Sequence, residues 1–534
     1  MTRQSDTDTH GLDVRTRQGI VRGVRQAAIE AWRNIPYAAA PVGEYRFRAP
    51  RPPAEWTGVR DGSTFGPVAW QSREGHFVGA AKNQAMSEDC LSLNVMRPAR
   101  GAGSGSGSTA SPGSADSADG RLLPVMVFIH GGAYAVGSSA EYPRNGEALV
   151  RDGRIVYVSI NYRLSALGYL DFSRFSTPER PMESNLGLRD QVAALQWVQQ
   201  NIAAFGGDPE NVTVFGESAG GNAVTTLMAT PSAHGLFAKA IAQSAPTNAI
   251  YPPELTQRWA DEFVAFLADR IEPGGVESTS VDDAGELLTR ADPSDLVEAA
   301  TALTLLTPDR DPGTIALCPV IDGDFLPERP LDAFKFGRAA RIPLIIGTND
   351  REGSLFTGRL DILATTPTRI RAIFSRTKKK ARKAIKAEYP GLPAKRPAAD
   401  FAGDYAFWYP TVKVAERHSR FAPVHFYRFD IAPRLVRQLG FDATHGLELF
   451  ALFDRMNGWF GRAMGALGGR RAFMRTGDRM RRHWIEFAHS GRVPGWPAYD
   501  EQTRSTMIFD EVDRVEDDPR GARRVAWQAF VPHV

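Results

Sequence analysis

One serine in this sequence has the surroundings of a catalytic nucleophile. Ser218 lies in the run Gly216-Glu217-Ser218-Ala219-Gly220-Gly221, between a short apolar stretch, Val212 to Phe215, and a helix-compatible stretch, Asn222 to Met228. Glycines two residues before and after the serine let a strand and a helix pass close together at a sharp turn, which pushes the hydroxyl out over the sheet. The pattern predicts that Ser218 attacks a carbonyl carbon. The alternative is a glycine-rich connection without chemistry.

A second glycine cluster could stabilise the negative oxygen that forms in such an attack. The run His130-Gly131-Gly132-Ala133-Tyr134 follows the apolar stretch Val125 to Ile129. Consecutive glycines let backbone N–H groups approach the oxygen, and loss of one such donor typically costs about 2.7 to 4 kcal/mol. We assign the oxyanion hole to the N–H groups of Gly131, Gly132 and Ala219, the last at the start of the predicted helix.

The base should be a histidine that follows the serine, because motifs of this kind have the order serine, acid, histidine. This order makes His130 a structural residue. Of the histidines far enough beyond Ser218, His425 lies in a strand-like run and His483 and His489 in a probable helix, while His418 and His533 have polar or terminal surroundings. His445 stands beside a glycine in a loop before a helical run, where catalytic groups commonly occur. We therefore predict His445 as the base.

The elements needed to position these groups alternate along the chain. A helix face with three- and four-residue spacing, Leu188 to Ile202, lies between the second and third of the predicted buried strands. Those strands are Val125 to Ile129, Ile155 to Ile160, Val212 to Phe215 and Pro343 to Ile346. Strands that alternate with helices predict an α/β fold with a central, mostly parallel sheet covered by helices on both faces.

Two polar segments interrupt this pattern. Gly101 to Gly120 has no aromatic or large aliphatic residue, so we expect a flexible insertion. Strand-like runs flank it, Leu91 to Val95 and Pro124 to Ile129, which places the insertion between two strands of one sheet. Arg376 to Lys386 is rich in lysine and arginine without interleaved aromatic residues, and we interpret it as a solvated helix face rather than a nucleic-acid site.

Composition argues against several classes of partner. The 64 basic and 61 acidic residues give a net charge of +3, too balanced to predict nucleic acid or an anionic membrane as the main partner. Two cysteines, Cys90 and Cys318, cannot build a disulfide framework or a cysteine-based metal site. Met1 to Gly11 lacks the apolar core of a secretory signal, and no apolar run approaches the roughly 20 residues that cross a bilayer. We expect a cytoplasmic protein that acts on small molecules; its oligomeric state stays open.

The sequence resembles the type B carboxylesterase and cholinesterase family from about Gly19 to about Phe530. The motifs that carry the resemblance are Phe47-Arg48-Ala49-Pro50, Ser87-Glu88-Asp89-Cys90-Leu91-Ser92-Leu93-Asn94, His130-Gly131-Gly132, Asn161-Tyr162-Arg163-Leu164, Phe205-Gly206-Gly207-Asp208-Pro209, Gly216 to Gly221, and Gly347-Thr348-Asn349-Asp350-Arg351-Glu352-Gly353-Ser354. The resemblance implies an α/β-hydrolase fold with long active-site insertions. We expect residues 15–534 to form one such domain after a disordered tail of residues 1–14.

The resemblance also supplies the acid. The family's glutamate before glycine falls on Glu352, its histidine on His445 and its serine on Ser218. The family usually has a second acidic residue just before that glutamate, whereas this chain has Arg351 there and Asp350 one position earlier. Asp350 is therefore a rival for the acid, since residues two apart point to the same side of an extended chain. The family's partner for the cysteine that matches Cys90 is absent, which implies a free thiol.

Together these features predict a carboxylic ester hydrolase that works through an acyl-enzyme without a metal or organic cofactor. Glu217 resembles a position where the family places a carboxylate near the acyl site, and it could equally complement the helix dipole. An amidase or carbamate hydrolase would use the same triad. The alternative from another class is a non-catalytic binding protein of the same family, which loss of Ser218, Glu352 or His445 would have favoured. The substrate's acyl and alcohol groups are not predicted.

Overall fold

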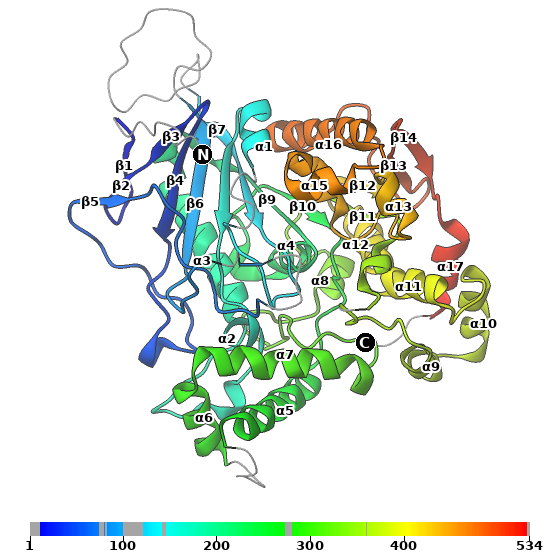
Figure 1. Ribbon diagram of the computed structural model, residues 1–534, viewed down its shortest axis with the longest axis horizontal. Coiled ribbons are helices and arrows are strands. Elements are labelled where there is room, and N and C mark those ends of the chain that lie inside the picture. Colours follow the sequence, from blue (N-terminus) through cyan, green and yellow to red (C-terminus); the bar gives the residue numbers. More distant parts are fainter. Residues whose placement is uncertain are drawn as a thin grey trace, which may run out of the picture.

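A twisted eleven-stranded sheet runs through the computed structural model, which describes residues 11–73, 79–80, 83–99, 121–140, 146–272, 280–358 and 360–530 (Figure 1). The strands of this sheet and of a smaller one, in chain order, are β1 (Asp13–Arg15), β2 (Ile20–Arg22), β3 (Val24–Gln26), β4 (Ile29–Pro36), β5 (Val59–Asp61), β6 (Ser92–Pro98), β7 (Leu123–Ile129), β8 (Val156–Ile160), β9 (Gly207–Glu217), β10 (Lys239–Gln243), β11 (Leu344–Asn349), β12 (Val424–Phe429), β13 (Ser505–Phe509) and β14 (Arg514–Asp517).

Parallel pairing dominates the centre of this sheet. Its order is β14-β13-β12-β11-β10-β9-β7-β8-β6-β4-β3, and all neighbours from β8 through β13 are parallel. The outer pairs, β13 with β14 on one side and β8, β6, β4 and β3 on the other, are antiparallel. A small separate sheet has the order β1-β2-β5. The predicted mostly parallel sheet is confirmed.

Helices cover both faces of the sheet. They are α1 (Glu147–Gly153), α2 (Ser165–Tyr169), α3 (Leu186–Asn201), α4 (Ala219–Ala229), α5 (Pro253–Ile271), α6 (Val281–Arg290), α7 (Pro293–Arg310), α8 (Pro330–Phe336), α9 (Pro367–Ser375), α10 (Lys379–Glu388), α11 (Lys395–Gly403), α12 (Tyr409–His418), α13 (Arg434–Gln438), α14 (Leu447–Leu452), α15 (Trp459–Met464), α16 (Arg470–Ser490) and α17 (Gly521–Phe530). Figure 1 shows α1 and α16 on one side and α3, α4 and α8 on the other.

Alternation along β7 explains why both faces are covered. Val125, Val127 and Ile129 pack into one core with α3 and α4, while Met126 and Phe128 pack into a second core with α1 and α16. Successive side chains of a strand point to opposite faces, so a continuous apolar run needs a cover on each side.

The topology brings several loops to one edge of the sheet. Because β7, β9, β10 and β11 are parallel neighbours, the residues that follow their carboxyl ends lie along the same edge. These residues are His130, Ser218, Ser244 and Asp350. In open α/β sheets, ligands bind at this edge.

Part of the predicted disordered tail has regular structure. We predicted a disordered tail of residues 1–14, but Asp13–Arg15 forms β1, and Leu12 and Val14 are buried, so the prediction is wrong for residues 11–14. Their alternating apolar side chains find cover because β1 pairs with β2. Residues 1–10 lie outside the described residues, as does the predicted insertion at 101–120, whose flanking strands β6 and β7 belong to one sheet. The basic run at Arg376 ends in α10, which buries only Ala381 and Ile385.

Candidate active site

Ser218 occupies a strained turn between β9 and α4. Its φ of 60° and ψ of −123° fall outside the helix and strand regions, a conformation that persists only where the surroundings impose it. The Ser218 N–H donates to Gln243 O at 2.9 Å, and its carbonyl accepts the Asn222 N–H at 2.8 Å. A Cβ on Gly220 would lie 2.1 Å from Ile129 O, so only glycine fits there. The glycines of the motif therefore permit close passage of α4 over β7.

His445 is joined to Glu352. The His445 Nδ1–H donates to Glu352 Oε2 at 2.6 Å, which leaves Nε2 as the proton acceptor of the neutral ring. The second carboxylate oxygen, Oε1, accepts the Ser244 hydroxyl and the Asn349 N–H, each at 2.6 Å. Glu352 is buried, and these three hydrogen bonds fix its orientation.

Asp350 lies in different surroundings from Glu352. Its carboxylate accepts a hydrogen bond from Arg520 at 2.6 Å and lies 3.6 Å from Arg428. The chain is not extended across these residues, because β11 ends at Asn349 and the 3-10 helix Glu352–Phe356 (η5) begins two residues after Asp350. The premise that both side chains point to the same side is therefore wrong, and only Glu352 reaches His445.

Glu217, directly before the nucleophile, is also close to the histidine. Its Oε1 lies 3.2 Å from His445 Nε2, and within the described part of the chain Nε2 makes no hydrogen bond, to Ser218 or to any other residue. Hydrogen bonds of catalytic groups are often long or misaligned without substrate. A Cβ on Gly131 would lie 3.2 Å from Ser218 Cβ and 3.0 Å from Glu217 Oε2, so the two glycine motifs are in contact.

A third buried carboxylate completes an acidic cluster. Glu448 Oε2 accepts a hydrogen bond of 2.5 Å from Asn349 Nδ2, and its Oε1 lies 3.4 Å from Gln243 Nε2. Burial raises the pKa of Glu217 to about 7, and burial with the charges of Glu217 and Glu352 raises the pKa of Glu448 to about 8. Burial by itself would lower the pKa of His445, but the charges of Glu217 and Glu352 outweigh it and raise that pKa to about 9. The groups titrate together.

Two of the predicted oxyanion-hole residues adjoin the serine, because Ala219 follows it directly and Gly131 lies against its side chain. The N–H groups of Gly131, Gly132 and Ala219 donate to no other residue in the described ranges. Gly132 has a φ of 112°, which favours glycine, and the Tyr134 hydroxyl ties the loop to Asn222 of α4 with a 2.6 Å hydrogen bond. These donors are free to bind a developing negative oxygen.

His130 has the surroundings of a structural residue. Its ring stacks on Tyr162 with 4.4 Å between centroids, and its carbonyl accepts the Tyr162 hydroxyl at 2.6 Å. Burial lowers its pKa to about 4, so the ring is neutral.

Aromatic side chains pack against His445. A π-helix, Asp404–Trp408, follows α11, and π-helical turns often occur at functional sites. Phe407 of this turn lies 4.4 Å from His445 between ring centroids, and Phe356 lies 5.1 Å away. Trp408 and Tyr409 instead contact Arg520 and Trp527. Of this aromatic run, only Phe407 contacts His445.

Sequence reasoning missed Ser244, Gln243 and Glu448. Gln243 is the last residue of β10, and Ser244 follows it. We had not predicted this strand, and neither residue belongs to a sequence motif. Glu448 stands three residues after His445 at the start of α14, a spacing that could have indicated it.

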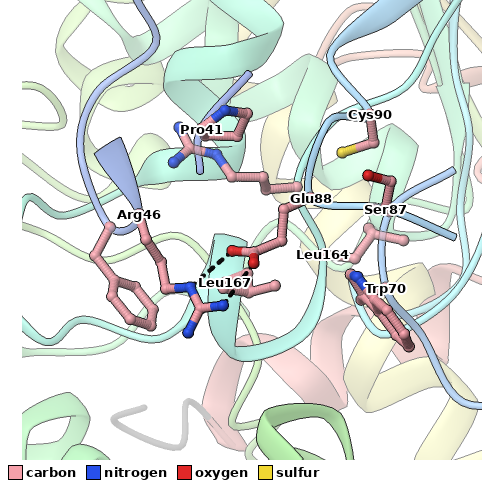
Figure 2. Close-up of a pocket in the computed structure, with 11 residues that line it drawn as sticks. Pro41, Arg46, Trp70, Ser87, Glu88, Cys90, Leu164 and Leu167 are labelled. Atoms are coloured by element: carbon pink, nitrogen blue, oxygen red, sulfur yellow. Dashed lines mark hydrogen bonds and ion pairs between the residues drawn. The ribbon is translucent and has the colours of Figure 1, made fainter. Parts of the chain in front are cut away.

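The structure holds a small cavity apart from these residues. Beside Cys90, about 10 Å³ of free volume is lined by Pro41, Trp70 and Leu167 and by the ion pair of Arg46 with Glu88 (Figure 2). Such a volume suits one water molecule at most. Both cysteines are free and buried. In the described ranges, no cluster of three His, Cys, Asp or Glu side chains could hold a metal, and no helix is long and apolar enough to span a membrane.

Similar proteins share nearly the whole length of the chain. A family model described as the carboxylesterase family matches residues 11–527. A para-nitrobenzyl esterase of Bacillus subtilis (strain 168) is 34% identical over 97% of this chain and 98% of its own, and a fumonisin B1 esterase of Sphingopyxis macrogoltabida is 33% identical over 95% and 87%. The solved Geobacillus stearothermophilus carboxylesterase EST55 matches with a TM-score of 0.79 and 32% identity, over 97% of this chain and all of its own.

Proposed function

The chain belongs to the carboxylesterase family and is a carboxylic ester hydrolase, and on this premise we propose that it cleaves esters through Ser218, His445 and Glu352 with an acyl-enzyme intermediate. The observation that carries the proposal is the 2.6 Å hydrogen bond between His445 Nδ1 and Glu352 Oε2, made while His445 Nε2 lies 3.2 Å from Glu217, the residue directly before a serine on a strained strand-to-helix turn. This geometry supports the roles of Ser218 as nucleophile, His445 as base and Glu352 as orienting acid.

Acylation begins when Ser218 Oγ attacks the ester carbonyl and His445 Nε2 takes its proton. The oxyanion is stabilised by the N–H groups of Gly131, Gly132 and Ala219. Collapse of the tetrahedral intermediate breaks the ester C–O bond, and His445 gives its proton to the leaving alcohol. Water then attacks the acyl group, with His445 again as base, and releases the carboxylic acid and Ser218.

Glu352 and Glu217 have different roles in this scheme. Glu352 fixes the tautomer with the proton on Nδ1 and stabilises the imidazolium that forms during each attack. Glu217 faces Nε2, the atom that must accept the serine proton, so it favours the protonated ring. Loss of the imidazolium charge weakens this attraction and frees Nε2 to turn toward Ser218.

Replacement of the nucleophile tests the proposal. Ser218→Ala should remove hydrolysis of p-nitrophenyl esters and leave the melting temperature near that of wild type, and an organophosphate should label Ser218 with one adduct per chain. Turnover near wild type, or an adduct on another residue, would refute the assignment. Assays of an ester, an amide and a carbamate with the same acyl group separate an esterase from the alternatives that share this triad.

A further inference from the structure

Arg351, between Asp350 and Glu352, ties the segment of the proposed acid to the loop of the proposed base. Its guanidinium Nη1 donates to Asp442 Oδ2 at 2.7 Å and to Gly440 O at 2.9 Å. Its backbone N–H donates to Ala443 O at 3.0 Å. One residue adjacent to Glu352 thus contacts three residues of the seven-residue stretch that contains His445.

The loop that Arg351 contacts has little regular structure of its own. Residues 440–446 lie in the connection between α13 and α14, and Gly440, Asp442 and Gly446 all have positive φ values, of 83°, 53° and 71°. A non-glycine residue such as Asp442 keeps this conformation only where its surroundings impose it. The position of His445 therefore depends on contacts that the loop makes with other segments.

Arg351 also contacts a third segment of the chain, helix α11. Its Nε donates to Asp400 Oδ1 of α11 at 2.8 Å, so the guanidinium bridges two carboxylates from different segments. A polar cavity of about 190 Å³ borders this region, and Arg351, Glu352 and Asp400 are among the residues that line it. The guanidinium of Arg351 therefore joins Asp400 and Asp442 at the border of a polar space lined by charged side chains.

We propose that Arg351 is a positioning residue for the reaction: it holds the His445 loop against the Glu352 segment at the separation that the 2.6 Å hydrogen bond requires. The proposal rests on the proposed function of Ser218, His445 and Glu352. An acidic residue at this position would face Asp400 and Asp442 and repel both. The positive charge of Arg351 is complementary to these two carboxylates. Displacement by about 1 Å at a catalytic group can cost about a hundredfold in rate.

Four variants and active-site titration test the role. Arg351→Met removes the bridge, and Arg351→Lys keeps the charge but cannot reproduce the planar fork that reaches two carboxylates and a carbonyl. Arg396→Met is the matched control, because Arg396 also contacts Asp442, at 3.2 Å, but is exposed and belongs to α11 rather than to the acid segment. Ser218→Ala monitors the proposed function separately. An organophosphate that releases p-nitrophenol, reacted to completion, counts the competent sites, so kcat is expressed per site.

The expected result is a loss in turnover that instability does not explain. Arg351→Met should lower kcat per titrated site at least about tenfold with KM within about twofold, Arg351→Lys should recover part of that loss, and Arg396→Met should stay within about twofold of wild type. A purely structural role would lower the number of titrated sites and leave kcat per site unchanged, which would overturn the proposal. Equal losses in Arg351→Met and Arg396→Met would also overturn it. Turnover in Ser218→Ala would instead refute the proposed function.

Discussion

His445 lies between two carboxylates: its Nε2 is 3.2 Å from Glu217 Oε1, while its Nδ1 donates to Glu352 Oε2 at 2.6 Å. Both carboxylates favour the imidazolium, yet a base that accepts the Ser218 proton must be neutral. The fraction of enzyme with a neutral His445 therefore depends on pH. Glu217 changes this dependence because its charge raises the pKa of His445.

Glu217→Gln should shift the pH dependence of turnover. Glu217 is the strongest of the neighbouring charges that raise the pKa of His445, so its loss should lower that pKa from about 9. Activity rises with pH as His445 loses its proton, so the acid limb of kcat/KM should move to lower pH by at least about half a unit. Rates measured between about pH 5 and about pH 10 check this. Glu210→Gln, an exposed change on the same strand, is the control, and an unmoved limb in Glu217→Gln would contradict the prediction.

Glu352→Gln and Asp350→Asn should differ strongly in turnover. The amide in Glu352→Gln no longer stabilises the imidazolium and favours the wrong tautomer, so kcat should fall at least about a hundredfold. Asp350 pairs with Arg520 rather than His445, and Asp350→Asn should cost less than about tenfold. Steady-state kinetics of the two purified variants on one ester decide this. Losses in the reverse order would assign the acid to Asp350.

Glu448→Gln should change how stability depends on pH. Burial and the neighbouring carboxylates raise the pKa of Glu448 from 4.5 to about 8 in the folded protein. A group with a raised folded pKa contributes stability that is present below its unfolded pKa and is lost as the pH rises through its folded pKa. Relative to Glu448→Gln, wild type should therefore lose stability between about pH 4.5 and about pH 8, by roughly 1.4 kcal/mol for each pKa unit between the two states.

Urea unfolding at about pH 5 and about pH 9 measures this difference. The exposed change Glu486→Gln should give the same difference from wild type at both pH values. If Glu448→Gln also differed from wild type by the same free energy of unfolding at both pH values, Glu448 would not have the raised pKa expected in the folded protein.

The cysteines should be unreactive in the folded protein. Cys90 and Cys318 are buried without a disulfide, and burial raises the pKa of both thiols well above the usual range, so almost no reactive thiolate is present. The reagent DTNB should detect no thiol in the native chain and both of its two thiols after unfolding in guanidinium chloride. Rapid reaction of either thiol in the native protein would indicate local opening around it.

The sequence by itself determined the parts of the site that depend on neighbours along the chain. Gly216 and Gly220 lie two residues before and after Ser218. They allow α4 to pass close over the sheet, and this need arises within the short turn itself. The glycines after His130 and the loop around His445 are similarly local signals. The alternation of apolar runs with helical spacing likewise predicted the parallel sheet, because burial on both faces needs an unbroken apolar strand.

Only the tertiary structure decided which side chains meet. The resemblance favoured Glu352 over Asp350, but the directions of the two carboxylates depend on the turn after β11, which sends Asp350 toward Arg520 and Glu352 toward His445. Ser244 is 108 residues from Glu352, and Asp442 is 91 residues from Arg351. No local pattern encodes such pairs, because parallel strands joined by helical crossovers bring together segments whose separation in sequence is arbitrary.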